Sequence, residues 1–186
     1  MATIIGLNNL SYSKLTKDDS SGSTYDAVKK IAGAINSGIK PKTSSETLYA
    51  DDGPADTVSA LGEVEVEFEA QDIPLFVQAD ILGHKLKNGV LIKNAADVAP
   101  YVALGFKSLK SNGKYRYVWL LKGRFELIEE KYETKGDKVK FQTPKIKGTF
   151  IKTESTGDWQ YTGDEDETGW TAATGASWFT SVYKPA

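Results

Sequence analysis

The feature that most constrains the fold is the stretch GEVEVEFEA at residues 62–70, in which glutamate and apolar residues alternate. A repeat of two is typical of a β-strand with one face in a core and the other face outside it. The inner face would consist of Val64, Val66 and Phe68. The outer face would be a ladder of carboxylates formed by Glu63, Glu65, Glu67 and Glu69. Neighbouring rungs of such a ladder lie about 6.6 Å apart and repel each other, so this outer face needs an explanation.

The same repeat predicts further strands. The clearest case is 100–127, where Asn112-Gly113, the favoured two-residue hairpin turn, separates two alternating segments. Segment 27–42 is expected to be a bent strand rather than a helix, because two glycines and a proline interrupt it. The remaining strands are expected at 4–15, 137–153 and 158–163.

One segment, at about 73–82, is typical of a helix. Asp72 suits the N-cap position, Pro74 suits the first turn, and Gly83 suits the C-terminal end. Together these patterns predict one domain over 1–186 that is mainly β, a sandwich or barrel-like fold with one flanking helix.

Three segments are expected to lie outside the regular elements. Residues 17–26 are polar and rich in glycine and serine, so they are predicted to be a loop. Residues 43–62 are predicted to be a long inter-strand loop with a short strand-like insert, and loops of this length are usually functional or mobile. Residues 165–186 are predicted to be a C-terminal arm or irregular tail. The chain has no membrane-spanning apolar run and no visible secretory signal.

Charge is strongly segregated along the chain, although the net charge is only −2. The net charge is +3 over 1–45, −10 over 46–80, +10 over 81–152 and −5 over 153–186. Opposite blocks can pair within one subunit, or head to tail between copies, and head-to-tail contacts close into rings or continue as filaments.

No constellation of residues typical of catalysis is visible. The single histidine, His84, is expected to interact with the end of the helix rather than to act as a base. The acidic segments 51–56 and 163–169 do not follow the ligand order of a calcium-binding EF-hand and are expected to be solvated loops. The sequence contains no cysteine and no phosphate-binding glycine motif. We therefore expect no catalytic residue, no metal and no cofactor.

Two charged features have both an ordinary and a functional interpretation. The basic block 81–152 contains KYRYVW, whose alternating aromatic and basic residues could form a base-stacking surface for nucleic acid. An ordinary strand face explains the block equally well. The glutamate ladder is most simply explained by cross-strand partners, for which Lys138, Lys140 and Arg116 are candidates.

Four segments together resemble the major tail proteins, or tail-tube proteins, of long-tailed siphophages that infect Gram-positive bacteria. These segments are 4–18, 46–84, 97–127 and 129–150. Their order and register carry the resemblance, since no short motif within them is diagnostic.

The resemblance implies a structural virion protein rather than an enzyme. Six copies would form a ring, and stacked rings would form a tube through which double-stranded DNA passes without specific binding. The implied partners are other copies of the chain, a tape-measure protein, a tail terminator and baseplate or initiator proteins, with no membrane. The implied location is the virion tail, assembled in the cytoplasm of the host bacterium.

The resemblance also suggests roles for particular residues. The carboxylates of Glu63, Glu65, Glu67 and Glu69 would face the lumen and keep DNA from sticking. A position on the tube exterior, or salt bridges within one subunit, would overturn this expectation of a carboxylate lining. An inter-ring or inter-subunit loop would include Leu48, Tyr49, Asp51, Asp52 and Pro54. Contacts made by the terminal arms would include Ile4, Ile5, Trp170 and Trp178. The alternative for the two tryptophans is that they pack on their own domain.

Two rival functions remain at this point. The chain could be the tube protein of a contractile tail or of a secretion-type injection system. It could also be a monomeric carbohydrate-binding β-sandwich, which would need exposed tryptophans grouped on a groove.

Overall fold

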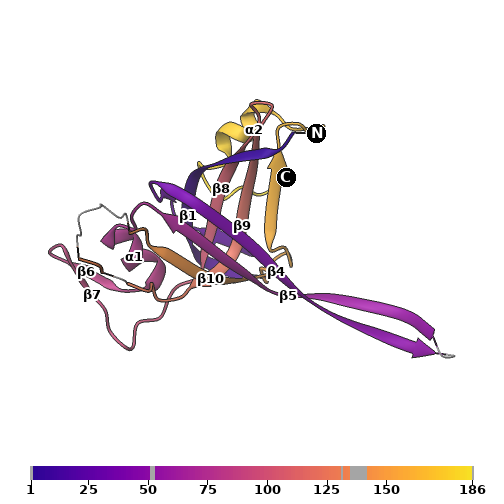
Figure 1. Ribbon diagram of the computed structural model, residues 1–186, viewed down its shortest axis with the longest axis horizontal. Coiled ribbons are helices and arrows are strands. Elements are labelled where there is room, and N and C mark those ends of the chain that lie inside the picture. Colours follow the sequence, from indigo (N-terminus) through magenta and orange to yellow (C-terminus); the bar gives the residue numbers. More distant parts are fainter. Residues whose placement is uncertain (1, 51–52, 131, 135–141, 186) are drawn as a thin grey trace.

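The computed structural model describes residues 2–50, 53–130, 132–134 and 142–185, and it is mainly β, as predicted (Figure 1). The strands are β1 (Ile4–Asp19), β2 (Gly22–Tyr25), β3 (Lys29–Lys30), β4 (Ala34–Ala50), β5 (Gly53–Ala70), β6 (Lys85–Lys87), β7 (Val90–Ile92), β8 (Val102–Lys110), β9 (Tyr115–Phe125), β10 (Lys145–Ile151) and β11 (Gln160–Asp164). The helices are α1 (Leu75–Leu82) and α2 (Ala172–Ser177). Neither helix in the described part of the chain has the length and apolar character that crossing a membrane requires.

The large sheet is antiparallel and curls into a half-barrel. Its strand order is β2-β1-β8-β9-β10-β5-β4. The sheet forks at β9, because β11 pairs with residues 116–120 of this strand and β10 pairs with residues 122–125. One branch therefore carries β11, and the other carries β10, β5 and β4.

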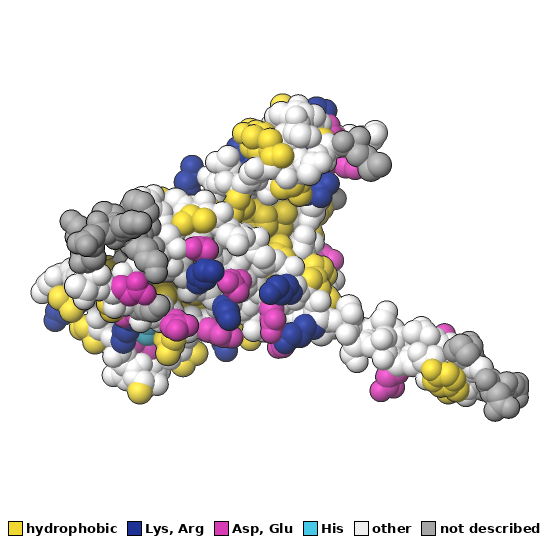
Figure 2. Space-filling view, viewed as in Figure 1, with side chains coloured by type: hydrophobic (Ala, Val, Ile, Leu, Met, Phe, Trp, Pro, Cys, Tyr) yellow, Lys and Arg dark blue, Asp and Glu magenta, His cyan; other side chains and the backbone are white. Residues whose placement is uncertain are grey.

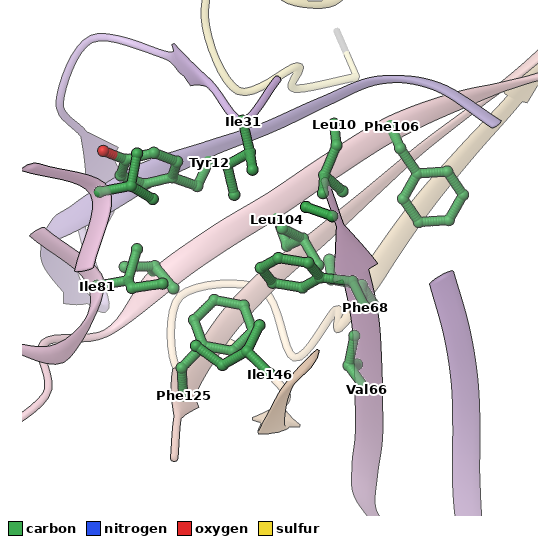
Figure 3. Packing of buried hydrophobic residues seen from close by; sticks show 14 of the residues in the cluster. Leu10, Tyr12, Ile31, Val66, Phe68, Ile81, Leu104, Phe106, Phe125 and Ile146 are labelled. Atoms are coloured by element: carbon green, nitrogen blue, oxygen red, sulfur yellow. The ribbon is translucent and has the colours of Figure 1, made fainter. Parts of the chain in front are cut away.

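The concave side of the curled sheet is filled by a hydrophobic core (Figure 3). Val64, Val66 and Phe68 of β5 are at most 1% exposed, which confirms the inner face predicted from the alternation. The ring of Phe68 packs edge-on against Phe125, with centroids 5.4 Å apart. Helix α1 adds Val77 and Ile81 to the same core.

A second cluster lies on the opposite face of β8 and β9, beneath the C-terminal segment. The indole Nε1 of Trp119 donates a hydrogen bond to the carbonyl oxygen of Trp178 at 2.8 Å. The expectation of an irregular tail is partly wrong, because residues 172–177 form α2, with Thr171 Oγ1 accepting from Thr174 N as the N-cap. Short helices with glycine and threonine have weak local preference, so aromatic packing against β9 fixes this segment.

Helix α1 confirms the predicted helix at 73–82, although it begins at Leu75. Asp72 is not the N-cap, because Pro74 holds that position and the helix has no side-chain cap. Gly83 ends the helix as predicted, with φ of 77° and its N–H bonded to the carbonyl oxygen of Ala79. A Cβ at this position would lie 2.3 Å from the carbonyl oxygen of Val98, so glycine also permits a close backbone contact.

The hairpin predicted at 100–127 is confirmed as β8 and β9, but its turn differs from the prediction. Lys110 N donates to Lys114 O at 2.8 Å, so three residues form the loop rather than two. Gly113, with φ of 82°, takes the left-handed conformation that such loops need.

A second hairpin, β6–β7, is absent from the sequence-based prediction. Asn88 and Gly89 both have positive φ, which is the geometry of a tight two-residue turn. The dipeptide Asn88-Gly89 is itself the sequence signal that predicts this turn. The strands flanking it are short and carry no strict alternation, so the pattern of apolar residues does not reveal them.

The segment predicted to be a long loop, 43–62, is instead an arm made of two paired strands. Strands β4 and β5 pair from Ala34 opposite Ala70 to Ala50 opposite Gly53, with three shifts in register, the outermost of them between Leu48 and Tyr49. The outer half of this ribbon projects from the body (Figure 1). The described side chains of the projecting part are exposed on both faces. Because neither face is buried, the sequence has no reason to alternate there, and the repeat of two disappears.

Smaller differences concern element ends. Residues 17–26, expected to be a loop, contain the end of β1 and all of β2. Strand β10 begins at Lys145, and residues 137–141 of the predicted strand 137–153 lie outside the described residues. The strand predicted at 158–163 is confirmed as β11.

Candidate functional site

The outer face of the branch β10-β5-β4 carries the glutamates and is mixed in charge (Figure 2). The register of β10 places Lys145 opposite Glu69 and Lys147 opposite Glu67. On the other side of β5, Lys40 of β4 lies opposite Glu65. A column of carboxylates is thus flanked by two columns that contain lysines.

Among the residues that the structure describes, lysines of the same subunit pair with three of the four glutamates. Lys42 Nζ lies 2.6 Å from Glu63 Oε1 and 2.7 Å from Glu65 Oε1. Lys145 Nζ lies 3.5 Å from Glu69 Oε2. The expectation of a bare acidic ladder is therefore wrong, and cross-strand pairing explains this face in the way that neighbouring strands commonly do.

The predicted lysine partners of the ladder differ from those observed. Lys138 and Lys140 lie outside the described residues. Arg116 instead lies 2.9 Å from Asp164 through its Nη2 atom. The sequence analysis did not identify Lys42 and Lys145 as partners. The available signal was the alternation of lysines at 40 and 42 and at 145 and 147, which is typical of strands that could pair with 62–70.

The hydrogen bonds and ion pairs on this face stabilise the charged forms of Lys42, Glu65 and Glu69. Hydrogen bonding to Lys42, together with the charge of this lysine, lowers the pKa of Glu65. Hydrogen bonds to Glu63 first, and then to Glu65, raise the pKa of Lys42 above its ordinary value. A hydrogen bond from Thr143 lowers the pKa of Glu69, with a further contribution from Lys145. Lys42 and its partner Glu65 therefore both keep their charges over the physiological pH range.

Removing Lys42 should change the titration of this face in a specific way. In Lys42→Gln, the pKa of Glu65 should rise toward its ordinary value, because the strongest interaction that stabilises the carboxylate is lost. NMR titration of the glutamate side-chain carboxyl carbons measures this shift. The matched control is Lys40→Gln, which should shift Glu65 less, since Lys40 acts on it only through its charge. Equal shifts in the two variants would contradict the assignment.

The arm presents apolar and acidic side chains to solvent. Leu48, Tyr49 and Val58 are 65%, 71% and 66% exposed, and Glu46 and Asp56 are exposed as well. Of the residues predicted to form an inter-subunit loop, Asp51 and Asp52 lie outside the described residues. The backbone of Pro54 pairs with Tyr49. Large exposed hydrophobic side chains on a projecting ribbon are typical of an interaction surface.

The residues predicted to make terminal-arm contacts fall into two groups. Ile4 and Ile5 are 49% and 63% exposed on β1 and are accessible to a neighbour. Trp178 is only 2% exposed, because it packs on its own subunit and stacks on Tyr183 at a centroid distance of 4.4 Å. Trp170 stacks on Tyr117 at 4.9 Å. The alternative of packing on their own domain thus describes both tryptophans.

The aromatic residues of KYRYVW are engaged within the subunit. Tyr117 donates to Glu165 Oε1 at 2.9 Å and packs against Trp170 and Trp178. Trp119 is fully buried. This segment therefore does not form an open base-stacking surface.

His84 is held by a carboxylate rather than by the helix end alone. Its Nδ1 lies 2.7 Å from Asp97 Oδ2, and its side chain is 3% exposed. The backbone N–H of Asn94 also donates to Asp97, at 2.9 Å. These hydrogen bonds, from Asn94 first and then from His84, lower the pKa of Asp97. The pair joins the end of α1 to the segment that precedes β8.

The acidic segment 163–169 is bound by lysines of its own subunit. Lys110 Nζ lies 2.7 Å from Asp164 Oδ1 and also contacts Asp166. Lys114 Nζ lies 2.9 Å from Asp166 Oδ1. Within the part of the chain that the structure describes, no group of three or more metal-ligating side chains is arranged to hold an ion.

Comparison with known proteins adds no assignment to this geometry. No protein-family model matches the chain, and no curated protein matches it significantly.

Proposed function

We propose that this chain is the structural subunit of a phage tail tube, built from stacked rings of about six copies around a channel for double-stranded DNA. Its partners would be further copies of itself, a tape-measure protein, a terminator and the initiator proteins of the baseplate. It would act in the virion tail after assembly in the host cytoplasm.

The arm formed by the outer parts of β4 and β5 carries this proposal. It extends well beyond the core, and its exposed leucine, tyrosine and valine contribute nothing to the packing of its own subunit. An isolated two-stranded ribbon is at best marginally stable in water. Contact with a second surface would remove these apolar side chains from water and so stabilise the arm. A neighbouring copy of the chain is the simplest source of such a surface.

The open half-barrel supports the same conclusion. Strand β4 lies at one end of the sheet order and β2 at the other, so both end strands keep a free edge within the described subunit. Free edges pair readily with other strands. Copies joined edge to edge around a ring would continue one sheet into the next and form a closed inner barrel, which removes the edges.

The charged face of β10-β5-β4 is our candidate for the channel lining, in a form that differs from a bare acidic ladder. Lysine lining a channel binds DNA by displacing counterions. Here Lys42 is held by Glu63 and Glu65, so its charge is balanced within the subunit. A lining of balanced, hydrated ion pairs would let DNA slide without stable contacts.

Electron microscopy of negatively stained protein over a range of concentrations, with sedimentation of the same samples, tests the proposal. We expect hollow rings or tubes above a threshold concentration, or on addition of the initiator complex. A subunit that remains monomeric under both conditions would contradict the proposal. A tube that binds a sheath protein along its outer surface would identify a contractile system instead.

A further inference from the structure

One face of the arm combines two acids with two aliphatic residues. Strand register places Glu46 opposite Val58 and Leu48 opposite Asp56, so the four side chains share one side of the ribbon. All four are exposed. The acidic character extends along the arm, because residues 43–62 contain four acids and no lysine or arginine. We call these four residues the arm face.

The hairpin β6–β7 carries a surface of the same construction with the opposite charge. Its register places Lys85 opposite Ile92 and Lys87 opposite Val90, again on one side of the ribbon. Val90 and Ile92 are 61% and 46% exposed, and both lysines are exposed. Neither lysine makes a salt bridge to another residue in the described part of the subunit. We call these four residues the acceptor face.

The two faces lie at opposite ends of the molecule. In Figure 1 the arm extends from one end of the longest axis, and the β6–β7 hairpin lies beside α1 at the other end. An arm therefore cannot reach the acceptor face of its own subunit. A contact between them has to join two copies head to tail, and such contacts propagate from copy to copy or close into a ring.

We propose that the arm face of one copy docks on the acceptor face of the next copy in the assembly. Glu46 and Asp56 would pair with Lys85 and Lys87, and the aliphatic residues of the two ribbons would cover one another. This inference rests on the proposed function and adds to it the surface that receives the arm. Complementary charge sets the register of the contact, while burial of the aliphatic side chains stabilises it.

Cross-linking is a direct test, because the chain contains no cysteine of its own. Leu48→Cys protein is mixed with Val90→Cys protein and oxidised, and the product is resolved on a non-reducing gel. We expect a dimer that contains one copy of each variant. The matched control replaces Leu48→Cys with Thr47→Cys, because Thr47 lies on the opposite side of the same ribbon. We expect at least about tenfold less dimer from the control, since its thiol points away.

Charge reversal provides a second and independent test. Lys85→Glu with Lys87→Glu should raise the concentration needed for assembly by about tenfold or more, and Glu46→Lys with Asp56→Lys should do the same. All four changes in one chain should restore assembly, because opposite charges face each other again. Circular dichroism checks that each variant is folded.

The outcomes separate this inference from the proposed function. If the parent protein forms tubes but cross-linking does not distinguish Leu48 from Thr47, or the fourfold variant does not recover, the docking inference is wrong and the tube proposal stands. If the specific cross-link forms but only short, open chains appear in the microscope, the docking inference stands and the tube proposal is wrong.

Discussion

Replacing residues 46–58 by Asn-Gly should abolish tube formation and leave the subunit folded. Ser45 lies opposite Ser59 in the ribbon, so a two-residue turn can close the shortened hairpin without strain. The described side chains among the removed residues belong to neither core cluster. The free energy of unfolding should therefore change by no more than about 1 kcal/mol. Assembly is measured by sedimentation and microscopy, and stability by urea unfolding followed by tryptophan fluorescence.

A milder variant separates the side chains of the arm from its length. Leu48→Ser with Val58→Ser keeps the ribbon and removes its exposed aliphatic surface, whereas Thr47→Ala with Thr57→Ala alters the opposite side as the matched control. We expect the serine variant to assemble poorly and the alanine variant to assemble normally. Normal tubes from the shortened protein would show that the arm is dispensable and would remove the main support for the proposed function.

Replacing Trp178 by alanine should lower the free energy of unfolding by about 3–5 kcal/mol. This tryptophan is 2% exposed, stacks on Tyr183 and lies within contact distance of Tyr117. The hydrogen bond from Trp119 Nε1 goes to the backbone carbonyl oxygen of this residue, which alanine keeps, so the expected loss comes from the contacts of the indole ring. The alanine variant would leave a cavity between the C-terminal segment and β9, and residues 165–185 would lose much of what holds them to the sheet. Chemical unfolding of the monomer, below the concentration at which it assembles, gives the value.

The control for this change is Trp170→Ala, because Trp170 is partly exposed, although it also stacks on Tyr117. We expect a smaller loss of stability from this variant. The opposite interpretation is that Trp178 belongs to an arm that reaches a neighbouring subunit. In that case Trp178→Ala would leave the monomer unchanged and weaken only assembly.

The candidate site shows how far a local pattern extends. The alternation at 62–70 predicted the buried face of β5 and the outward position of its glutamates. Side chains two residues apart in a strand point to the same face, so one set is buried while the other is exposed. The pattern does not reveal which strands lie beside β5. The partners of the glutamates come from β4 and β10, and β10 lies about eighty residues away in the sequence. The net charge around β5 depends on the side chains of both neighbouring strands as well as on its own. The segment 62–70 contains only the glutamates, so read alone it predicts an acidic face without lysine partners.

The acceptor face shows a different limit. The turn at Asn88-Gly89 is encoded locally, because its two positive φ angles favour this dipeptide. The sequence does not show that Lys85 and Lys87 share one surface with Ile92 and Val90. The strand register of the folded hairpin is needed to place these side chains together. The opposite positions of this hairpin and the arm depend on the whole sheet between them.

The sequence by itself determined the mainly-β class, the apolar face of β5, the helix α1 with Gly83 at its end, and the β8–β9 hairpin. Each of these depends on burial periodicity or on a backbone angle that a few neighbouring residues control. Only the tertiary structure decided that 43–62 is a paired arm, that Trp178 is buried, and that the glutamates are matched by lysines. These features depend on contacts between residues far apart in the chain, and the free energy of such contacts is set by the packing of the whole fold.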